Sequence, residues 1–395
     1  MSKSGPSPWV VHKFGGSSVA DAACFQRVAG ILTSQPSHRL AVVLSACRGV
    51  TDVLLNLVAA AEKQDPGVTA TLAVLRERHA GIAEALLTAE AAKAWVTALD
   101  RDLEDLSRIL QTTSLMRSAA RNVHDLVAGY GELWSTTLFT AYLKTRWSDA
   151  AQVKWLDARN VVVADWGPLG PAVQWEASRT LLGQTGAADF TGLLVIPGFV
   201  ARNPQGVQTT LGRNGSDFSA SIFGALLDAS EIQIWTDVDG VLSADPRRVP
   251  NAQVIDQLSY NEAMELAYFG AKVIHPQTMA PAVGKSIPIH IRNTFAPGNP
   301  STLICAKPSS ALTVKGITTI EDVALINIEG AGMIGVPGTA HRLFGALREE
   351  GINVVLISQG SSEHSICCAI PGREAAHAER VVRAAFAREL DGGQI

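Results

Sequence analysis

The stretch WVVHKFGGSS, residues 9–18, decides the fold class. Its mostly apolar part, residues 9–14, is followed by two glycines and two serines at 15–18. This pattern is typical of a buried strand followed by a turn and a helix. Helical spacing at 21–32 and a second apolar run at 41–46 continue the alternation. Strand, helix and strand repeated in this way predict a largely parallel sheet with helices on both faces.

Further strand patterns lie at 193–201, 231–237 and 287–293, whereas residues 51–145 have mostly helical spacing. Proline, glycine and serine then gather at 296–314, where the periodicity stops. The chain therefore divides into a large α/β part and a smaller C-terminal part.

Beyond that boundary the order is strand, helix, strand, strand, helix, which is typical of a small α+β sandwich of the ferredoxin-like type. The second of these strands is expected at 352–358. The expected domains are 1–305 and 315–395, joined by a linker at 306–314.

The composition indicates a folded protein with a large core. Of 395 residues, 47% are hydrophobic and 18% charged, and the net charge is −4. This balance provides no basic field for nucleic acid, and no apolar run reaches the roughly 18 residues of a membrane span. We expect a cytoplasmic protein with no nucleic-acid or membrane partner. The five cysteines include no CxxC pair and are expected to be buried thiols, not disulfides or zinc ligands.

The end of the first strand combines a cation with a flexible turn. Lys13 is followed by Phe14, Gly15, Gly16 and Ser17. Paired glycines let backbone N–H groups approach an anion, and the start of a helix adds positive potential. The pattern favours phosphate binding over the alternative, a plain Gly-Gly turn with a solvated lysine.

The densest polar stretch, TTLGRNGSD at 209–217, lies between a strand and a helix. Arg213 can bind a carboxylate through two parallel hydrogen bonds. Asp217 stands at the predicted helix start, where an N-cap role is the structural alternative to a role in a site. A third polar strand end is WTDVDGV at 235–241. Because ligands bind beyond the carboxyl ends of parallel strands, these strand ends predict one shared crevice.

A glycine-rich turn, GAGMIG at 330–335, has the spacing of a dinucleotide fingerprint. The next strand ends in Ser-Gln-Gly at 358–360, without the acidic residue that would bind a ribose. The two alternatives that we favour are a plain turn and a loop that binds a small ligand.

Together, these stretches resemble the aspartate kinases in order and spacing, over roughly residues 9–305. The motifs that carry the resemblance are KFGGSS (13–18), SACRGVTD (45–52), GELWS (131–135), TTLGRNGSD (209–217), IWTDVDGV (234–241), DPR (245–247) and LSYNEAMELAYFGAKVIHPQT (258–278). Within that family the chain is most similar to the N-terminal kinase region of the bifunctional aspartokinase–homoserine dehydrogenases. The segments GAGMIGVPG (330–338) and SQGSSEHSI (358–366) resemble the ACT regulatory module of the same enzymes.

The resemblance implies an amino-acid-kinase fold, a three-layer αβα sandwich with a mainly parallel sheet, followed by a ferredoxin-like ACT module. It implies that ATP, with Mg²⁺, phosphorylates the side-chain carboxylate of L-aspartate to give 4-phospho-L-aspartate, the first step towards lysine, threonine and methionine. An allosteric amino acid, threonine or lysine, would bind the ACT module. A homodimer or a higher homo-oligomer would form.

By the same resemblance, each candidate residue receives a role. Lys13 would bridge the transferring phosphoryl group, and Asp217 would organise the active site. The phosphate path and nucleotide site would contain Gly15, Gly16, Ser17, Thr236, Asp237, Arg247 and Lys272. The aspartate pocket would contain Ser45, Thr51, Glu132 and Arg213. The regulatory site would involve Gly332, Met333, Ile334, Gly335, Gln359 and Ser361.

Two other functions stay open at this point: another amino-acid or nucleotide kinase of the same fold, and a non-catalytic amino-acid sensor built around 315–395. Arg213 and Glu132 favour an α-amino acid over a nucleotide as acceptor. Lys13 and Asp217 favour a working kinase over a sensor. Because kinases of this kind usually carry two ACT modules, we expect the sequence to be part of a longer protein, with a naturally short kinase as the alternative.

Overall fold

The computed structural model describes residues 8–35, 37, 39–268, 275–309, 312–361 and 363–395. The chain divides into two compact units, Met1–Thr318 and Thr319–Ile395, and each unit is described by itself.

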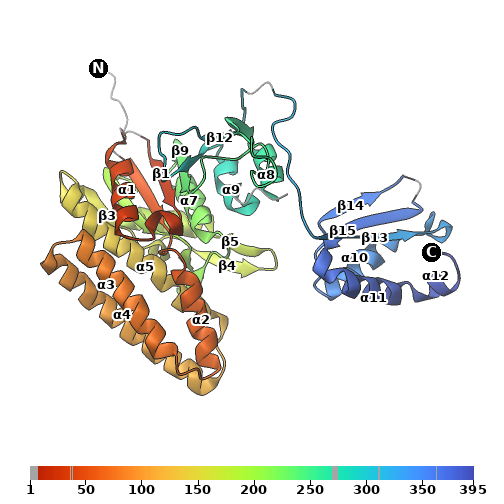
Figure 1. The fold of residues 1–395 in the computed structure, drawn as a ribbon, viewed down its shortest axis with the longest axis horizontal. Coiled ribbons are helices and arrows are strands. Elements are labelled where there is room, and N and C mark those ends of the chain that lie inside the picture. The colour runs from red at the N-terminus through yellow and green to blue at the C-terminus, as the bar shows by residue number, and fades with distance from the viewer. Residues whose placement is uncertain (1–7, 36, 38, 269–274, 310–311, 362) are drawn as a thin grey trace. The chain divides into compact units, whose positions relative to one another are not determined.

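The first unit is built on an eight-stranded sheet with helices packed on both faces (Figure 1). Neighbouring strands run parallel except for one antiparallel pair, β11 and β12. In spatial order the strands are β10 (Gln257–Ser259), β12 (Thr302–Cys305), β11 (Ile289–Asn293), β9 (Glu231–Thr236), β1 (Val10–Phe14), β2 (Arg39–Leu44), β6 (Gly192–Pro197) and β3 (Val153–Trp155).

Two hydrophobic cores lie on opposite faces of this sheet. One core contains side chains of five helices, α1 (Ala22–Thr33), α2 (Val50–Glu62), α3 (Val68–Leu86), α4 (Ala89–Met116) and α5 (Arg121–Arg146). The other contains side chains of four helices, α6 (Trp175–Thr185), α7 (Gly215–Leu226), α8 (Tyr260–Tyr268) and α9 (Pro276–Gly284). Two hairpins complete the unit, β4 (Ala164–Gly167) with β5 (Gly170–Val173), and β7 (Val200–Arg202) with β8 (Gln208–Thr210).

The central strand β2 shows why this sequence forms such a sheet. All six of its residues are buried, and Val42 and Val43 belong to opposite cores. A strand whose side chains point alternately to two dry faces requires an uninterrupted apolar run, and β-branched residues suit it. The predicted mainly parallel, three-layer α/β architecture is confirmed, as is the helical stretch after residue 51.

The second unit has a three-stranded antiparallel sheet in the order β13 (Val323–Glu329), β15 (Ser365–Pro371) and β14 (Leu356–Gln359). Its core is formed with α10 (Thr339–Glu349) and α11 (Ala375–Ala385), and a short helix, α12 (Ala387–Asp391), follows. The predicted order of elements is confirmed. The strand expected at 352–358 begins later, because the amide of Ile352 still donates to the carbonyl of Leu347 at the end of α10.

Two smaller expectations have mixed outcomes. The five cysteines are free thiols, but only Cys24, Cys47 and Cys368 are buried, so the prediction of burial is wrong for Cys305 and Cys367, which are half-buried. Along the described part of the chain, no helix is long and apolar enough to cross a membrane.

Candidate active site

The end of β1 holds an ion pair with the start of α7. The Nζ atom of Lys13 lies 2.6 Å from Oδ1 of Asp217, and the two side chains are only 11% and 14% exposed. Asp217 is in the first turn of α7, where the helix dipole favours a negative charge. The N-cap residue is Asn214, in the left-handed region with φ 58°, so the N-cap alternative for Asp217 is wrong. The carboxylate is therefore directed at the lysine.

The Gly-Gly turn brings the backbone of β1 against its neighbours. A Cβ atom on Gly16 would lie 3.0 Å from the carbonyl oxygen of Ala46, and the amide of Gly15 donates to the carbonyl of Trp235. The turn leads into a four-residue 3-10 helix, Gly16–Val19, and not directly into α1. Half-buried Ser17 lies in this short helix. The predicted turn after the strand is present and half-buried, and the helix predicted at 21–32 is confirmed as α1.

Three parallel strand ends meet at this edge of the sheet. Phe14 of β1 pairs in register with Leu44 of β2 and with Trp235 of β9. The amide of Ser45, just after β2, donates to the carbonyl of Phe14 over 3.1 Å. Thr236 is the last residue of β9. The register thus places Lys13, Ser45 and Thr236 at the same carboxyl edge, as predicted from the strand pattern.

Glu132 reaches this edge from α5 and is an uncompensated buried carboxyl group. The residue is 3% exposed, and its Oε2 atom is buried with no hydrogen-bond partner among the residues that the structure describes. Burial raises the pKa of Glu132 to about 8, and a hydrogen bond from the Ala46 backbone opposes that rise. A buried carboxyl group without a cation is poised to accept one.

The aspartate-pocket candidates of α2, α5 and the β2 end lie close together. The hydroxyl of Ser135, one turn after Glu132, donates to the carbonyl of Ser45 over 2.8 Å. Gly131 packs so tightly that an added Cβ would lie 2.7 Å from the Cβ of Ala46. Thr51 is in the first turn of α2, next to this contact.

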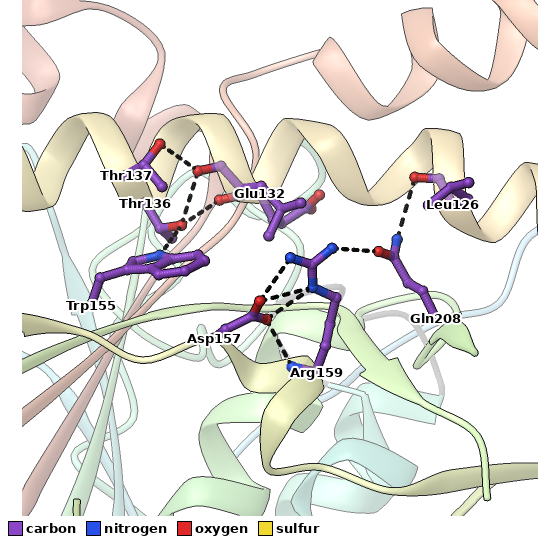
Figure 2. A network of polar contacts seen from close by, with 9 residues as sticks. Leu126, Glu132, Thr136, Thr137, Trp155, Asp157, Arg159 and Gln208 are labelled. Atoms are coloured by element: carbon purple, nitrogen blue, oxygen red, sulfur yellow. Dashed lines mark hydrogen bonds and ion pairs between the residues drawn. The ribbon is translucent and has the colours of Figure 1, made fainter. Parts of the chain in front are cut away.

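A polar network fixes α5 next to Glu132 (Figure 2). The hydroxyl of Thr136 donates to the carbonyl of Glu132 over 2.7 Å and accepts from the indole N–H of Trp155 over 3.0 Å. Nearer the start of α5, Gln208 donates to the carbonyl of Leu126 and accepts from Arg159. These bonds join α5 to strand β3 of the sheet and to β8 of the β7–β8 hairpin, so tertiary contacts hold the helix that carries Glu132.

Arg213 is exposed, in the loop before α7. Together with Trp166, Phe218 and His275 it lines a cavity of about 690 Å³ between the β4–β5 hairpin and helices α6, α7 and α9. Within the described residues, no hydrogen bond or ion pair joins Arg213 to Glu132. Ser45 and Glu132 thus lie close to the contact between α5 and the end of β2, whereas Arg213 lines this cavity.

Three of the nucleotide candidates, Thr236, Asp237 and Arg247, lie at the end of β9 or in the loop that follows it. Thr236 donates to the carboxylate of the exposed Asp237 over 3.2 Å. The Nη2 atom of Arg247 lies 2.7 Å from Oδ2 of Asp245. Hydrogen bonds from the side chain and backbone of Arg247 lower the pKa of Asp245 to about 2. Lys272 is outside the described residues.

The structure adds polar residues at this edge that the sequence patterns did not single out. Asn293, at the end of β11, donates to Asp239 over 2.7 Å, and Thr294 shares a 2.7 Å hydrogen bond with Ser18. Asn293 ends a strand of the same parallel sheet, so the strand-end rule applied to 287–293 would have found it. Phe199 has φ 66°, a strained value for a bulky residue that no sequence pattern predicts.

In the second unit, the regulatory candidates lie in the turn before α10 and at the end of β14. Met333 is buried, whereas Ile334 is exposed. The amide of Gly335 donates to the carboxylate of Glu363, next to the candidate segment at 359–361. The turn with Gly332 thus faces the segment after β14, and Gln359 and Ser361 are exposed.

Comparison with known proteins places the fold and these residues in a family. Residues 8–293 match the Amino acid kinase family, and residues 326–386 match the ACT domain. The chain is 39% identical, over 98% of its length, to bifunctional aspartokinase/homoserine dehydrogenase 2 of Arabidopsis thaliana, and spans 43% of that protein.

Two solved structures are also similar. E. coli aspartokinase III in complex with lysine and aspartate is 30% identical with a TM-score of 0.74, over 92% of this chain and 79% of that one. The same enzyme in complex with aspartate and ADP is 27% identical with a TM-score of 0.70, over 95% of this chain and 99% of that one. The chain belongs to the amino acid kinase family, in its aspartokinase branch, and carries an ACT domain.

Proposed function

We propose that this chain is an aspartate kinase, which transfers the γ-phosphoryl group of ATP to the side-chain carboxylate of L-aspartate. The observation that carries the proposal is the half-buried Lys13–Asp217 pair at the same sheet edge as the unpaired carboxyl group of Glu132. Lys13 would offer positive charge to a phosphoryl group, and Glu132 would offer negative charge to an ammonium ion. The relatives that the chain matches are named aspartokinases.

The chemistry requires charge and position more than covalent help. The acceptor carboxylate is ionised at neutral pH, so no general base is needed. Lys13 would neutralise charge on the transferring phosphoryl group, and Asp217 would hold the lysine in place over 2.6 Å. The amides of Gly15 and Gly16 and the hydroxyl of Ser17 would line the path of the phosphates.

The acceptor site would be formed around Glu132. Its unpaired Oε2 atom would accept the ammonium group of aspartate, which removes the cost of the buried charge. Ser45 and Thr51 would donate to the acceptor, and Arg213 would bind its α-carboxylate. Because Arg213 is exposed in the free chain, it would turn towards the pocket on binding.

The nucleotide site would contain Thr236, Asp237, Arg247 and Lys272. Mg²⁺ would be held mainly through the oxygens of ATP, with the nearby carboxylates of this edge as further ligands. The ion supplies charge neutralisation when bound. E. coli aspartokinase III was solved with aspartate and ADP, which supports this choice of ligands.

Regulation would occur in the ACT domain. Threonine or lysine would bind at the turn with Gly332, Met333, Ile334 and Gly335, facing Gln359 and Ser361. Lysine is a ligand of E. coli aspartokinase III, which supports an amino-acid effector. A homodimer or higher oligomer and a cytoplasmic location complete the proposal. Activity or the melting temperature should change when threonine or lysine is added.

The test is acyl-phosphate formation. Purified protein with Mg·ATP is supplied with L-aspartate, L-glutamate or UMP, and hydroxylamine traps the acyl phosphate as a hydroxamate. We expect product with aspartate alone. Product with glutamate or phosphorylation of UMP would favour another kinase of the fold. Binding of threonine or lysine by folded protein without any turnover would favour a sensor and contradict the proposed activity.

A further inference from the structure

Three aromatic rings lie buried directly behind the candidate phosphate site. His12 and Phe14, on either side of Lys13 in β1, stack with Trp235 of β9 at ring-centroid distances of 6.4 and 5.7 Å. His12 is fully buried, and Trp235 is 2% exposed. The rings of His12 and Trp235 carry polar nitrogen atoms. Burying such an atom costs free energy unless it forms a hydrogen bond.

A hydrogen bond satisfies the indole N–H of Trp235 and one of the two ring nitrogens of His12. The indole N–H of Trp235 donates to Nδ1 of His12 over 3.1 Å. Because an indole nitrogen can only donate, Nδ1 must be unprotonated and the proton of the neutral imidazole is on Nε2. Burial lowers the pKa of His12 to about 3, so the ring stays neutral over the working range of pH. Protonation of His12 therefore does not break this bond over that range of pH.

This bond joins the two strands whose ends form the candidate site. His12 precedes Lys13 in β1, and Trp235 precedes Thr236 in β9. The backbone carbonyl of Trp235 accepts from Gly15. Trp235 is thus fixed to β1 by its side chain and by its backbone, on both sides of the lysine.

Hydrogen bonds also fix the end of β9 on its other side, next to β11. The amide of Thr294 donates to the carbonyl of Thr236 over 2.9 Å, and the Thr294 hydroxyl shares a 2.7 Å hydrogen bond with Ser18. Ser18 and Thr294 are both fully buried. The residues after β9 therefore have little freedom to move relative to the turn after β1.

We propose that His12 is a positioning residue, which acts through Trp235 to hold Thr236 and Asp237 in register with Lys13 for nucleotide binding. The inference rests on the proposed function for the identity of the reaction, but only on nucleotide binding for its test. Phosphoryl transfer depends on placement of the nucleotide, and a small displacement of a strand end is costly in rate. Direct contact of His12 with the substrates is not required.

The experiment compares His12→Leu, which removes the acceptor, with His12→Asn, whose side-chain oxygen can replace Nδ1. In His12→Leu the indole N–H is buried without a partner, and we expect affinity for ADP to fall about tenfold. We expect His12→Asn to stay within about threefold of the wild type, since the hydrogen bond is kept. The KM for aspartate should change by less than about twofold in both variants, because the acceptor site lies elsewhere.

The double variant separates positioning from general stability. Trp235→Phe removes the donor and should weaken ADP binding as much as His12→Leu does. Adding His12→Leu to Trp235→Phe should then have no further effect, because the two residues act through one bond. If His12→Leu does not fold, Trp235→Phe and His12→Asn still provide the comparison, by calorimetric titration with ADP.

Several results would overturn the proposal. Unchanged ADP affinity in His12→Leu, with only a lower melting temperature, would reduce His12 to a core residue. Additive effects in the double variant would show that His12 does not act through Trp235. A wild type that binds ADP but does not phosphorylate aspartate would contradict the proposed function alone, and the ADP comparison would still decide the role of His12. A wild type that binds no ADP would contradict both.

Discussion

Two ion pairs of the first unit have nearly equal lengths and differ in almost every other respect. Lys13 and Asp217 are 2.6 Å apart and 11% and 14% exposed, and they join β1 to α7. Arg247 and Asp245 are 2.7 Å apart within one loop, and the arginine is 81% exposed. A largely buried pair whose partners are far apart in the sequence forms only when the whole unit is folded. An exposed pair within one loop contributes little to the free energy of unfolding. In the proposed function the Lys13–Asp217 pair would be the chemical centre, and the exposed pair would lie at its rim.

The largest expected effect is that of Lys13→Ala. It removes the cation that would stabilise the transferring phosphoryl group, so kcat should fall about a thousandfold while the protein stays folded. The measurement is the initial rate of hydroxamate formation at saturating ATP and aspartate, with circular dichroism as the folding control. Near-normal turnover would show that Lys13 has no role in the mechanism. The Lys13–Asp217 pair would then matter no more for catalysis than the Arg247–Asp245 pair.

The second effect concerns Glu132 and the pH. The pKa of Glu132 is raised to about 8 in the free protein, and an ammonium ligand favours the ionised form. Affinity for aspartate should therefore rise about tenfold per pH unit below pH 8 and level off above it, with release of a proton on binding. Glu132→Gln should weaken binding about a hundredfold at pH 8 and abolish the proton release. Calorimetry in buffers of different ionisation enthalpy measures both quantities.

The same group makes the stability of the free protein depend on pH. A folded-state pKa above the unfolded value of 4.5 means that its contribution to stability is complete below pH 4.5 and is lost as the pH rises through about 8. In Glu132→Gln this part of the pH dependence should disappear from the urea unfolding curve. A pH dependence unchanged by the substitution would show that Glu132 is not the buried acid described here.

The smallest effect is expected for Arg247→Ala. An exposed arginine would contribute to nucleotide binding through a screened charge, so the KM for ATP should rise by less than about tenfold, with kcat unchanged. The difference from the wild type should shrink as salt is added. A loss of kcat comparable to that of Lys13→Ala would contradict the division between a buried centre and an exposed rim.

Much of the fold follows from the sequence because its determinants are local or periodic. The apolar run of β2 and the Gly-Gly turn after β1 predict a parallel sheet, and parallel strands place Ser45 and Thr236 at one edge without further information. The orientation of side chains at helix starts is less predictable. Asn214 takes the N-cap position with φ 58°, which frees Asp217 for Lys13, and only the packed loop decides this.

The rest of the site depends on contacts between distant segments. His12 reads as an ordinary member of a buried strand, and its bond with Trp235 spans 223 positions of the sequence. Glu132 is recognisable as a buried acid only after α5 is packed against the end of β2. Arg213 stays a predicted acceptor residue, and its loop places it at the cavity that Trp166 and Phe218 also line.

The most direct test of the account replaces the two carboxylates of the paired sites by their amides. Asp217→Asn and Asp245→Asn keep the shape of the side chain and remove its charge, at pairs of 2.6 and 2.7 Å. With Mg·ATP and L-aspartate at saturation, we predict that kcat falls about a hundredfold or more for Asp217→Asn and stays within about twofold for Asp245→Asn. Equal rates for the two variants would contradict the claim that the Lys13–Asp217 pair is the catalytic centre.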